Sequence, residues 1–129
     1  MSTPAAVLRT CAYNGDITQV RNLLHEGVDP NVADKYGRTA LSLASEQGHV
    51  ALVEVLLAGG AWVDPHEDYD TYQTPLMMAA WNGHLEVAKK LVKAGANPGF
   101  HVGFAQRTAE SYARQNGHET VAAYLAGLG

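Results

Sequence analysis

The sequence predicts an all-α repeat solenoid, a stack of helix-turn-helix units, because three of its features recur at nearly constant spacing. A first glycine recurs at intervals of 33, 35 and 34 residues, at Gly15, Gly48, Gly83 and Gly117. A second glycine follows each of these 12 residues later, at Gly27, Gly60, Gly95 and Gly129. A threonine lies nine residues before Gly48, Gly83 and Gly117, at Thr39, Thr74 and Thr108.

The clearest unit runs from Thr74 to Asn97 and predicts two short helices. The Thr74 hydroxyl can cap a helix that begins at Pro75, and Gly83 suits the left-handed turn that ends it. A second helix is expected from near His84 to Gly95, with an apolar stripe formed by Leu85, Ala88, Leu91 and Val92. Isolated helices shorter than about 12–15 residues are marginal in water, so each pair must stack on another.

This pattern of Thr-Pro-Leu at 74–76, Gly-His at 83–84 and Gly-Ala at 95–96, with a period near 33, resembles the ankyrin repeat. The resemblance covers essentially the whole chain, residues 1–129, as a single ankyrin-repeat domain. It implies stacked helix-turn-helix repeats joined by β-turn fingers, with four repeats at about 4–33, 34–66, 67–102 and 103–129. The first and last repeats match only in their helical skeleton, and we expect them to act as caps.

Each of the first two repeats has its own set of expected core positions. In the first repeat, which begins with a cap and first turn at residues 2–4, these are Leu8, Cys11, Ala12, Ile17, Val20, Leu23 and Leu24. In the second repeat they are Leu41, Leu43, Ala44, Val50, Val53, Leu56 and Leu57. Residues 28–38, called the first finger, contain Pro30, Asp34 and Gly37 and are expected to form a projecting β-turn.

The second finger, residues 61–73, is two residues longer than the first and is acidic. It contains no Lys or Arg, and its four carboxylates account for the formal net charge of −4: Asp64, Glu67, Asp68 and Asp70. We expect a solvated loop that attracts a partner with a basic patch. In the last repeat, Glu110 and Glu119 replace apolar core positions, as expected of a repeat whose outward face meets water.

Composition bounds the protein class. A chain of 129 residues with 47% hydrophobic residues suits one domain. The single cysteine, Cys11, excludes an internal disulfide, and we expect it to be a small packed residue rather than a reactive thiol. No apolar run approaches the length of a membrane span, and residues 1–4 lead directly into the first repeat, so we expect a cytoplasmic protein.

Metal, catalytic and nucleic-acid sites are all weakly supported. His49, His84 and His118 share one repeat position, so stacking places them about 10 Å apart, too far to share a metal ion. The second finger lacks the glycine and the final glutamate of a calcium loop. No phosphate-binding, nucleophile-elbow or zinc motif occurs, so we expect no enzyme, no cofactor and no metal. The negative net charge argues against nucleic acid.

The ankyrin resemblance implies that a partner protein docks on the concave face, formed by the finger tips and the ends of the first helix of each pair. By register, the expected partner-binding residues are Tyr13, Lys35, Tyr36, Arg38, Glu46, Asp70, Gln73, Trp81, Asn82, Phe104 and Arg107. Aromatic and arginine side chains are enriched at interface hot spots, and large apolar groups on a surface call for a partner. Trp81 is the expected central anchor, flanked by Tyr36 and Arg38 on one side and by Phe104 and Arg107 on the other.

Two function hypotheses remain open. Small ankyrin proteins include kinase inhibitors and toxin-immunity proteins, which favours a monomeric module that binds one partner protein and inhibits or escorts it. The alternative is a scaffold segment of a larger assembly, or one excised from a longer chain. An enzyme is a remote third possibility.

Overall fold

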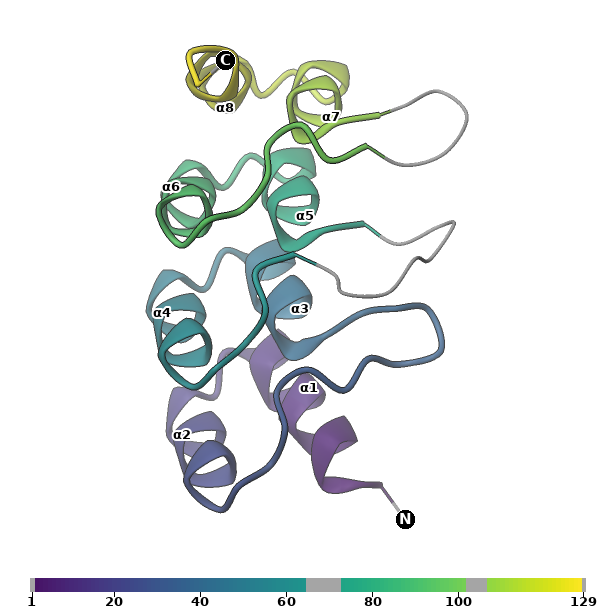
Figure 1. Cartoon of the computed structure of the whole chain (residues 1–129), viewed down its shortest axis with the longest axis vertical. Coiled ribbons are helices and arrows are strands. Elements are labelled where there is room, and N and C mark those ends of the chain that lie inside the picture. The colour runs from purple at the N-terminus through teal and green to yellow at the C-terminus, as the bar shows by residue number, and fades with distance from the viewer. Residues whose placement is uncertain (1, 65–72, 102–106, 129) are drawn as a thin grey trace.

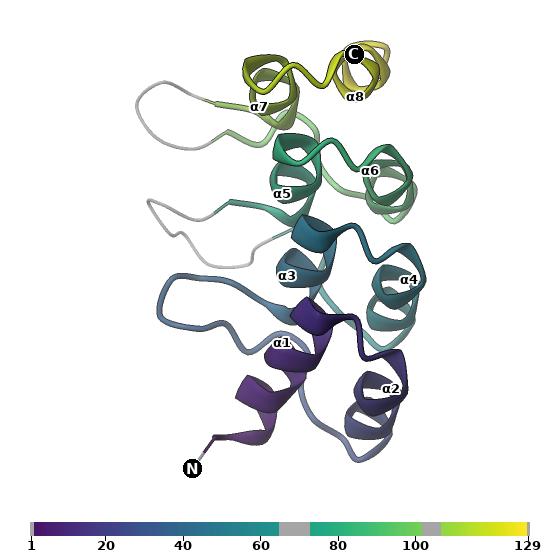
Figure 2. The same cartoon turned by 180° about the vertical axis from the view of Figure 1, so that it is seen from behind.

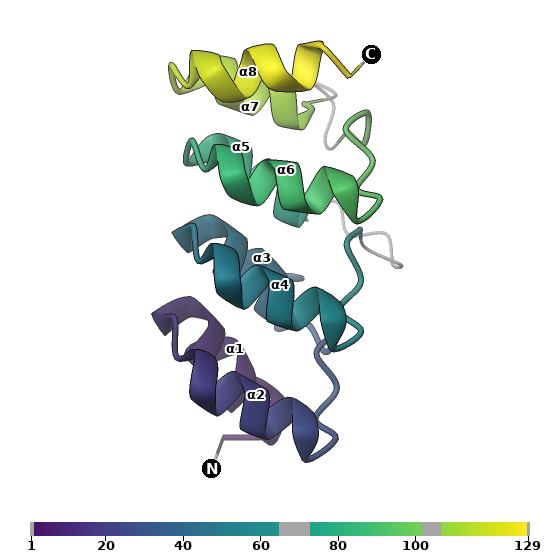
Figure 3. The same ribbon diagram turned by 90° about the vertical axis from the view of Figure 1, so that its left-hand side faces the viewer.

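The structure, a computed structural model, describes residues 2–64, 73–101 and 107–128, which contain eight helices in two layers (Figure 1). The inner layer lies next to the fingers and consists of α1 (Pro4–Asn14), α3 (Ala40–Gln47), α5 (Pro75–Trp81) and α7 (Ala109–Gln115). The outer layer consists of α2 (Ile17–His25), α4 (Val50–Ala58), α6 (Leu85–Lys93) and α8 (Glu119–Ala126). Helix pairs stack along one axis, with the two termini at opposite ends (Figures 2 and 3). The predicted helical solenoid is confirmed.

Threonine caps begin all four inner helices. The hydroxyl oxygens of Thr3, Thr39, Thr74 and Thr108 each accept a hydrogen bond from the backbone N–H three residues later, at 3.1–3.3 Å. Each bond satisfies a backbone donor that the first helical turn leaves open. The predicted helix start at Pro75 is confirmed, and the recurring threonine has the physical role that the sequence indicated.

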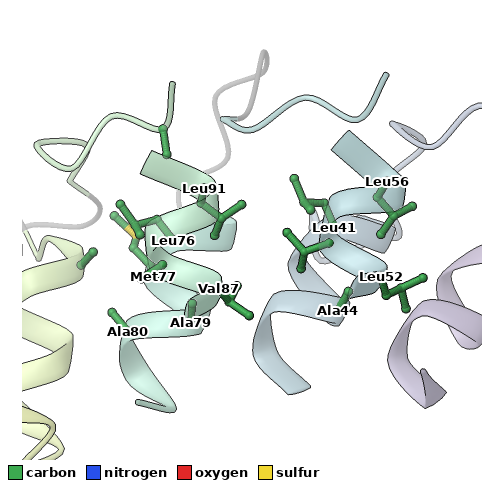
Figure 4. Close-up of a cluster of buried hydrophobic side chains, with 14 of the residues drawn as sticks. Leu41, Ala44, Leu52, Leu56, Leu76, Met77, Ala79, Ala80, Val87 and Leu91 are labelled. Atoms are coloured by element: carbon green, nitrogen blue, oxygen red, sulfur yellow. The ribbon is translucent and has the colours of Figure 1, made fainter. Parts of the chain in front are cut away.

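The hydrophobic core runs between successive helix pairs (Figure 4). Its central side chains are buried and come from α3 to α6: Leu41, Ala44, Leu52, Leu56, Leu76, Met77, Ala79, Ala80, Val87 and Leu91. The sequence misplaced part of the outer-helix stripe. Leu52 and Val87 are buried, whereas Leu57, Leu85 and Val92 are only partly buried. An outer helix contacts its own inner helix and its outer neighbours, so its buried face is rotated from the stripe expected for a single partner.

Polar side chains occupy the two ends of the stack. Thr10 and Gln19 are exposed in the first helix pair, at the repeat positions where the second buries Leu43 and Leu52. In the last pair, Arg114 bonds Glu110 at 3.0 Å and lies 3.6 Å from Glu119. Another repeat stacked on α7 would bury these charges, which is costly. The replacements support the proposal that the first and last repeats act as caps.

Histidines join the second and third repeats to the repeats before them. His49 Nε2 lies 3.1 Å from the Tyr13 carbonyl oxygen, and His84 Nε2 lies 2.9 Å from that of Glu46. Both rings therefore have the structural role that the repeat spacing predicted.

The same rings lie against the first glycines. A Cβ placed on Gly15 would lie 2.9 Å from His49 Cε1, and one on Gly48 would lie 2.6 Å from His84 Nδ1. A Cβ placed on Gly83 would lie 2.6 Å from His118 Nδ1. These glycines are required both for their positive φ and for the space that they leave.

Gly83→Ala is expected to destabilise the protein more than Gly117→Ala. The two glycines have nearly the same backbone, with φ of 74° and 75°, so a strain of about 1–2 kcal/mol is common to both substitutions. Only the Cβ added at Gly83 meets a histidine ring, since at Gly117 no described residue other than its chain neighbours lies within 4 Å of that position. In urea denaturation, Gly83→Ala should lose at least about 1 kcal/mol more. Equal losses would mean that His118 moves aside freely.

Candidate partner-binding face

The described residues of the predicted binding set lie at or near the surface. Tyr13, Tyr36 and Trp81 are 45%, 58% and 36% exposed. Lys35, Arg38, Asn82 and Arg107 are also exposed, and Glu46 and Gln73 are partly buried. Asp70 and Phe104 lie outside the described residues.

A groove of about 470 Å³ lies between α1, the first finger and α3. Its lining combines apolar and charged side chains, namely Ala6, Arg9, Thr10, Tyr13, Asp34, Arg38, Leu43 and Glu46. Three members of the predicted set, Tyr13, Arg38 and Glu46, meet in this groove although they come from three different elements. The groove therefore brings together part of the predicted binding set.

Hydrogen bonds to Asp34 fix the tip of the first finger. Its Oδ1 accepts from the backbone N–H groups of Tyr36 and Arg38 at 2.9 Å, and its Oδ2 accepts from Arg38 Nε at 2.8 Å. Partial burial opposes the charged form, but these bonds lower the pKa of Asp34 below its usual value. Gly37 closes the turn at φ 81°, with its N–H bonded to the Asp34 carbonyl. The predicted turn of the first finger is confirmed.

Cations accompany the exposed ring of Tyr36. Lys35 Nζ and Arg38 Cζ each lie 5.0 Å from the ring centroid, within the range of a cation–π contact. Arg38 is thus held by both Asp34 and Tyr36, and its side chain remains 47% exposed. An exposed but oriented guanidinium loses little rotamer freedom when it binds a ligand.

Trp81 belongs to a second cluster. Its ring meets Tyr112 edge-on, with centroids 5.2 Å apart and planes at 66°, and Arg107 Cζ lies 6.0 Å from the Tyr112 ring. Tyr112 is buried, so Trp81 rests on a firm base and leaves about a third of its surface open. In the described part of the chain, no hydrogen bond or ring contact joins Trp81 to Tyr36 or Arg38. Among the described residues the ring contacts form two groups, one around Tyr36 and one around Trp81, and the flanking of Trp81 by Tyr36 and Arg38 stays a prediction.

The backbone beneath these exposed side chains is fixed by the following repeat. The carbonyl oxygens of Tyr13 and Glu46 lie against His49 and His84, and that of Trp81 accepts from Asn116 Nδ2 at 2.8 Å. Tyr13, Glu46 and Trp81 occupy the same position in successive repeats. Their side chains can therefore vary without loss of the contact between repeats.

The predicted binding set lacks two residues that belong to this face. Arg9 lines the groove and donates from Nη1 to the Val32 carbonyl at 2.8 Å. The sequence could have indicated it, because Arg9 places a long cationic side chain at the repeat position that Ser42 and Met77 occupy in the next two repeats. Tyr112, which supports the Trp81 ring, gave no signal, because it does not depart from an ordinary helix position.

Asp64 does not belong to a solvated acidic loop, so its assignment to the acidic finger was wrong. It is partly buried, and its Oδ2 accepts from the Asn97 backbone N–H at 2.8 Å. Its Oδ1 is inaccessible to solvent and has no hydrogen-bond partner among the described residues. Burial raises the pKa of Asp64, and the bond from Asn97 only partly opposes this. The other three predicted finger carboxylates, Glu67, Asp68 and Asp70, lie outside the described residues.

Asn31 shows what the position of Asp64 favours, because it lies at the same distance from the second glycine of its own repeat. Asn31 Oδ1 accepts from Trp62 N at 2.7 Å, as Asp64 does from Asn97. The Asn31 amide also donates from Nδ2 to the Gly60 carbonyl at 3.0 Å. A carboxylate cannot make that second bond.

Asp64→Asn is therefore expected to stabilise the protein at pH 7 by about 1 kcal/mol, the net value of one hydrogen bond. Because the folded pKa of Asp64 is raised, its contribution to stability is greatest below the unfolded value and is lost as pH rises through the folded pKa. The advantage of the variant over the wild type should then shrink as pH falls. Urea denaturation of both proteins from pH 7 to pH 3.5 measures this.

The reciprocal variant Asn31→Asp is the control, and it should destabilise the protein with the same pH dependence. An unchanged or lowered stability of Asp64→Asn at pH 7 would contradict the assignment.

The other candidate sites are not supported as functional. Cys11 is partly buried, and burial together with the charge of Asp16 raises the pKa of its thiol, which fits a packed residue. Within residues 2–64, 73–101 and 107–128, no group of three or more His, Cys, Asp or Glu side chains could hold a metal ion. Over the same ranges, no helix has the length and apolar character to cross a membrane.

Fold and surface together define a helical repeat protein whose candidate partner-binding residues, where described, lie at or near the surface. A family model described as ankyrin repeats, in three copies, matches residues 8–102. The chain therefore belongs to the ankyrin repeat family, whose repeats are protein-interaction modules.

Similar proteins differ in how much of their length this chain spans. Ankyrin repeat domain-containing protein 63 of Mus musculus is 37% identical over 111 residues, which are 84% of this chain but 28% of that protein. Cyclin-dependent kinase 4 inhibitor B of Rattus norvegicus is 34% identical over 121 residues, which are 93% of this chain and 90% of that protein. Its counterpart in Homo sapiens is 34% identical over 119 residues, with 92% and 83% covered.

Proposed function

We propose that this chain binds a partner protein through its concave face and thereby inhibits or escorts that partner. The observation that carries the proposal is Trp81, which remains 36% exposed while its ring rests on buried Tyr112 and its carbonyl is bound by Asn116. An exposed tryptophan that rests on a buried ring, on the same proposed face as the groove lined by Tyr13 and Arg38, is typical of an interface anchor.

Inhibition is supported by the similarity to cyclin-dependent kinase 4 inhibitor B, which extends over nearly the whole of both chains. A protein kinase of the cyclin-dependent class is accordingly the first partner to test. The partner-binding residues of the described chain are Tyr13, Lys35, Tyr36, Arg38, Glu46, Gln73, Trp81, Asn82 and Arg107. The basic patch proposed for the partner rests on the charges of Glu67, Asp68 and Asp70, which lie outside the described residues.

The alternative is a scaffold segment, and the protein of Mus musculus favours it, because the chain spans only 28% of that protein's length. The two functions differ in what binding does. An inhibitor changes the activity of its bound partner, whereas a scaffold leaves that activity unchanged. On either reading we propose a non-enzymatic, cytoplasmic protein that is monomeric on its own.

Trp81→Ala is expected to weaken partner binding by roughly thirtyfold or more, the effect of losing about 2 kcal/mol at an interface hot spot. The partner is identified by photo-cross-linking from a probe amino acid at Asn82, beginning with purified cyclin-dependent kinase 4. Isothermal titration then compares the wild type and the variant. The thermal unfolding midpoint should change little, because the indole is already partly exposed.

Trp62→Ala is the matched control, because Trp62 is also exposed but lies in the turn that follows α4, outside the predicted binding set. It should leave the affinity unchanged. The proposal fails if Trp81→Ala binds normally, or if both tryptophan variants weaken binding equally.

A further inference from the structure

The groove beside the first finger presents two arginines whose positions are set by the fold. Arg9 Nη1 donates to the Val32 carbonyl at 2.8 Å, and Arg38 Nε donates to Asp34 at 2.8 Å. Each guanidinium has five N–H donors, and these bonds use one on each. Both side chains line the groove, where Arg38 is exposed and Arg9 is partly buried.

The carboxylates of the groove do not neutralise these arginines equally. Asp34 is engaged by Arg38 and by two backbone N–H groups, and its lowered pKa reflects that. Glu46 is the second carboxylate of the lining, and its side chain has no hydrogen bond or ion pair among the described residues. The local field therefore favours an anion near Arg9 and Arg38 and weakens toward Glu46.

The rest of the lining is compatible with a peptide segment. Ala6 and Leu43 give the groove an apolar part, and the exposed ring of Tyr13 forms one side. A guanidinium binds a carboxylate through two parallel hydrogen bonds, a geometry that a lysine cannot reproduce. Lys35 and Arg107 add further positive charge to the described part of the concave face.

We propose that the groove receives an acidic side chain of the partner protein, whose carboxylate accepts hydrogen bonds from Arg9 and Arg38. The inference rests on the proposed partner-binding function and assigns the chemistry of one contact within it. Glu46 opposes this contact and sets the limit of the acidic segment, since a second carboxylate placed beside it would be repelled.

The experiment uses a defined probe, an acetylated and amidated peptide in which two glutamates flank a leucine, and a matched peptide with glutamine in place of glutamate. Both are titrated into ¹⁵N-labelled protein, and the Nε–Hε signals of the arginines are followed by NMR. The acidic peptide should shift the signals of Arg9 and Arg38 saturably, and the glutamine peptide should not. Added salt should weaken binding.

Three variants then test the assignment by sign. Arg38→Gln should weaken binding of the acidic peptide at least fivefold, whereas Glu46→Gln should strengthen it about twofold or more. Arg21→Gln removes the same charge from the outer helix α2, away from the groove, and should have no effect. Arg38→Gln also removes a hydrogen bond that holds the first finger. Glu46→Gln is therefore the variant that tests the charge of the groove while it leaves the hydrogen bonds of the finger intact.

The inference is overturned if the peptide does not bind, if it shifts only the lysine-rich helix α6, or if Glu46→Gln weakens binding. Equal effects of Arg21→Gln and Arg38→Gln would show attraction to net charge alone. Failure of these tests while Trp81→Ala still abolishes partner binding would leave the proposed function standing. If the acidic peptide binds as expected but Trp81→Ala binds the partner normally, Trp81 is not the anchor and the proposed role of the groove still stands.

Discussion

The stacking of this protein depends on one repeated contact, in which a histidine ring lies over a glycine and against the end of the preceding inner helix. The ring occupies space that a side chain would need, since a Cβ added at Gly15 would lie 2.9 Å from the His49 ring and one added at Gly48 would lie 2.6 Å from the His84 ring. It reaches a carbonyl oxygen near the end of that helix, whose last carbonyls have no partner within it. The contact thus fixes the register between repeats, and each short helix pair obtains the burial that it could not obtain alone.

The bonds between repeats would also separate stability from the proposed recognition. The carbonyl oxygens of Tyr13 and Glu46 contact histidines and that of Trp81 accepts from Asn116, which leaves their side chains for the proposed binding face. An aromatic ring, a carboxylate and an indole are equally compatible with the backbone bond. Because the backbone is held in place, the side chains are presented in fixed positions, and binding requires less ordering.

Repeat spacing predicted the helices, their threonine caps and the structural role of His49 and His84. It could not predict which face of an outer helix is buried, because that depends on contacts with neighbours on both sides, and so Leu52 and Val87 were missed. It also assigned Asp64 to a solvated loop from charge alone, although the side chain is tethered to Asn97. The groove could not be predicted from the sequence, because only the fold brings Arg9, Arg38 and Glu46 together.

Net charge is a poor guide to the partner of such a protein, because a solenoid distributes its charges along a line. The formal net charge of −4 favours a basic partner, yet the described part of the concave face carries Arg9, Arg38 and Arg107. Interactions between exposed charges are screened over about 8 Å at physiological salt, which is roughly the spacing of two helix layers. In the proposed complex, each repeat would therefore select the charge of the partner segment opposite it. An acidic segment at the first finger and a basic one near the second finger would fit together in only one direction, so the order of charges along the stack would set the orientation of the bound partner.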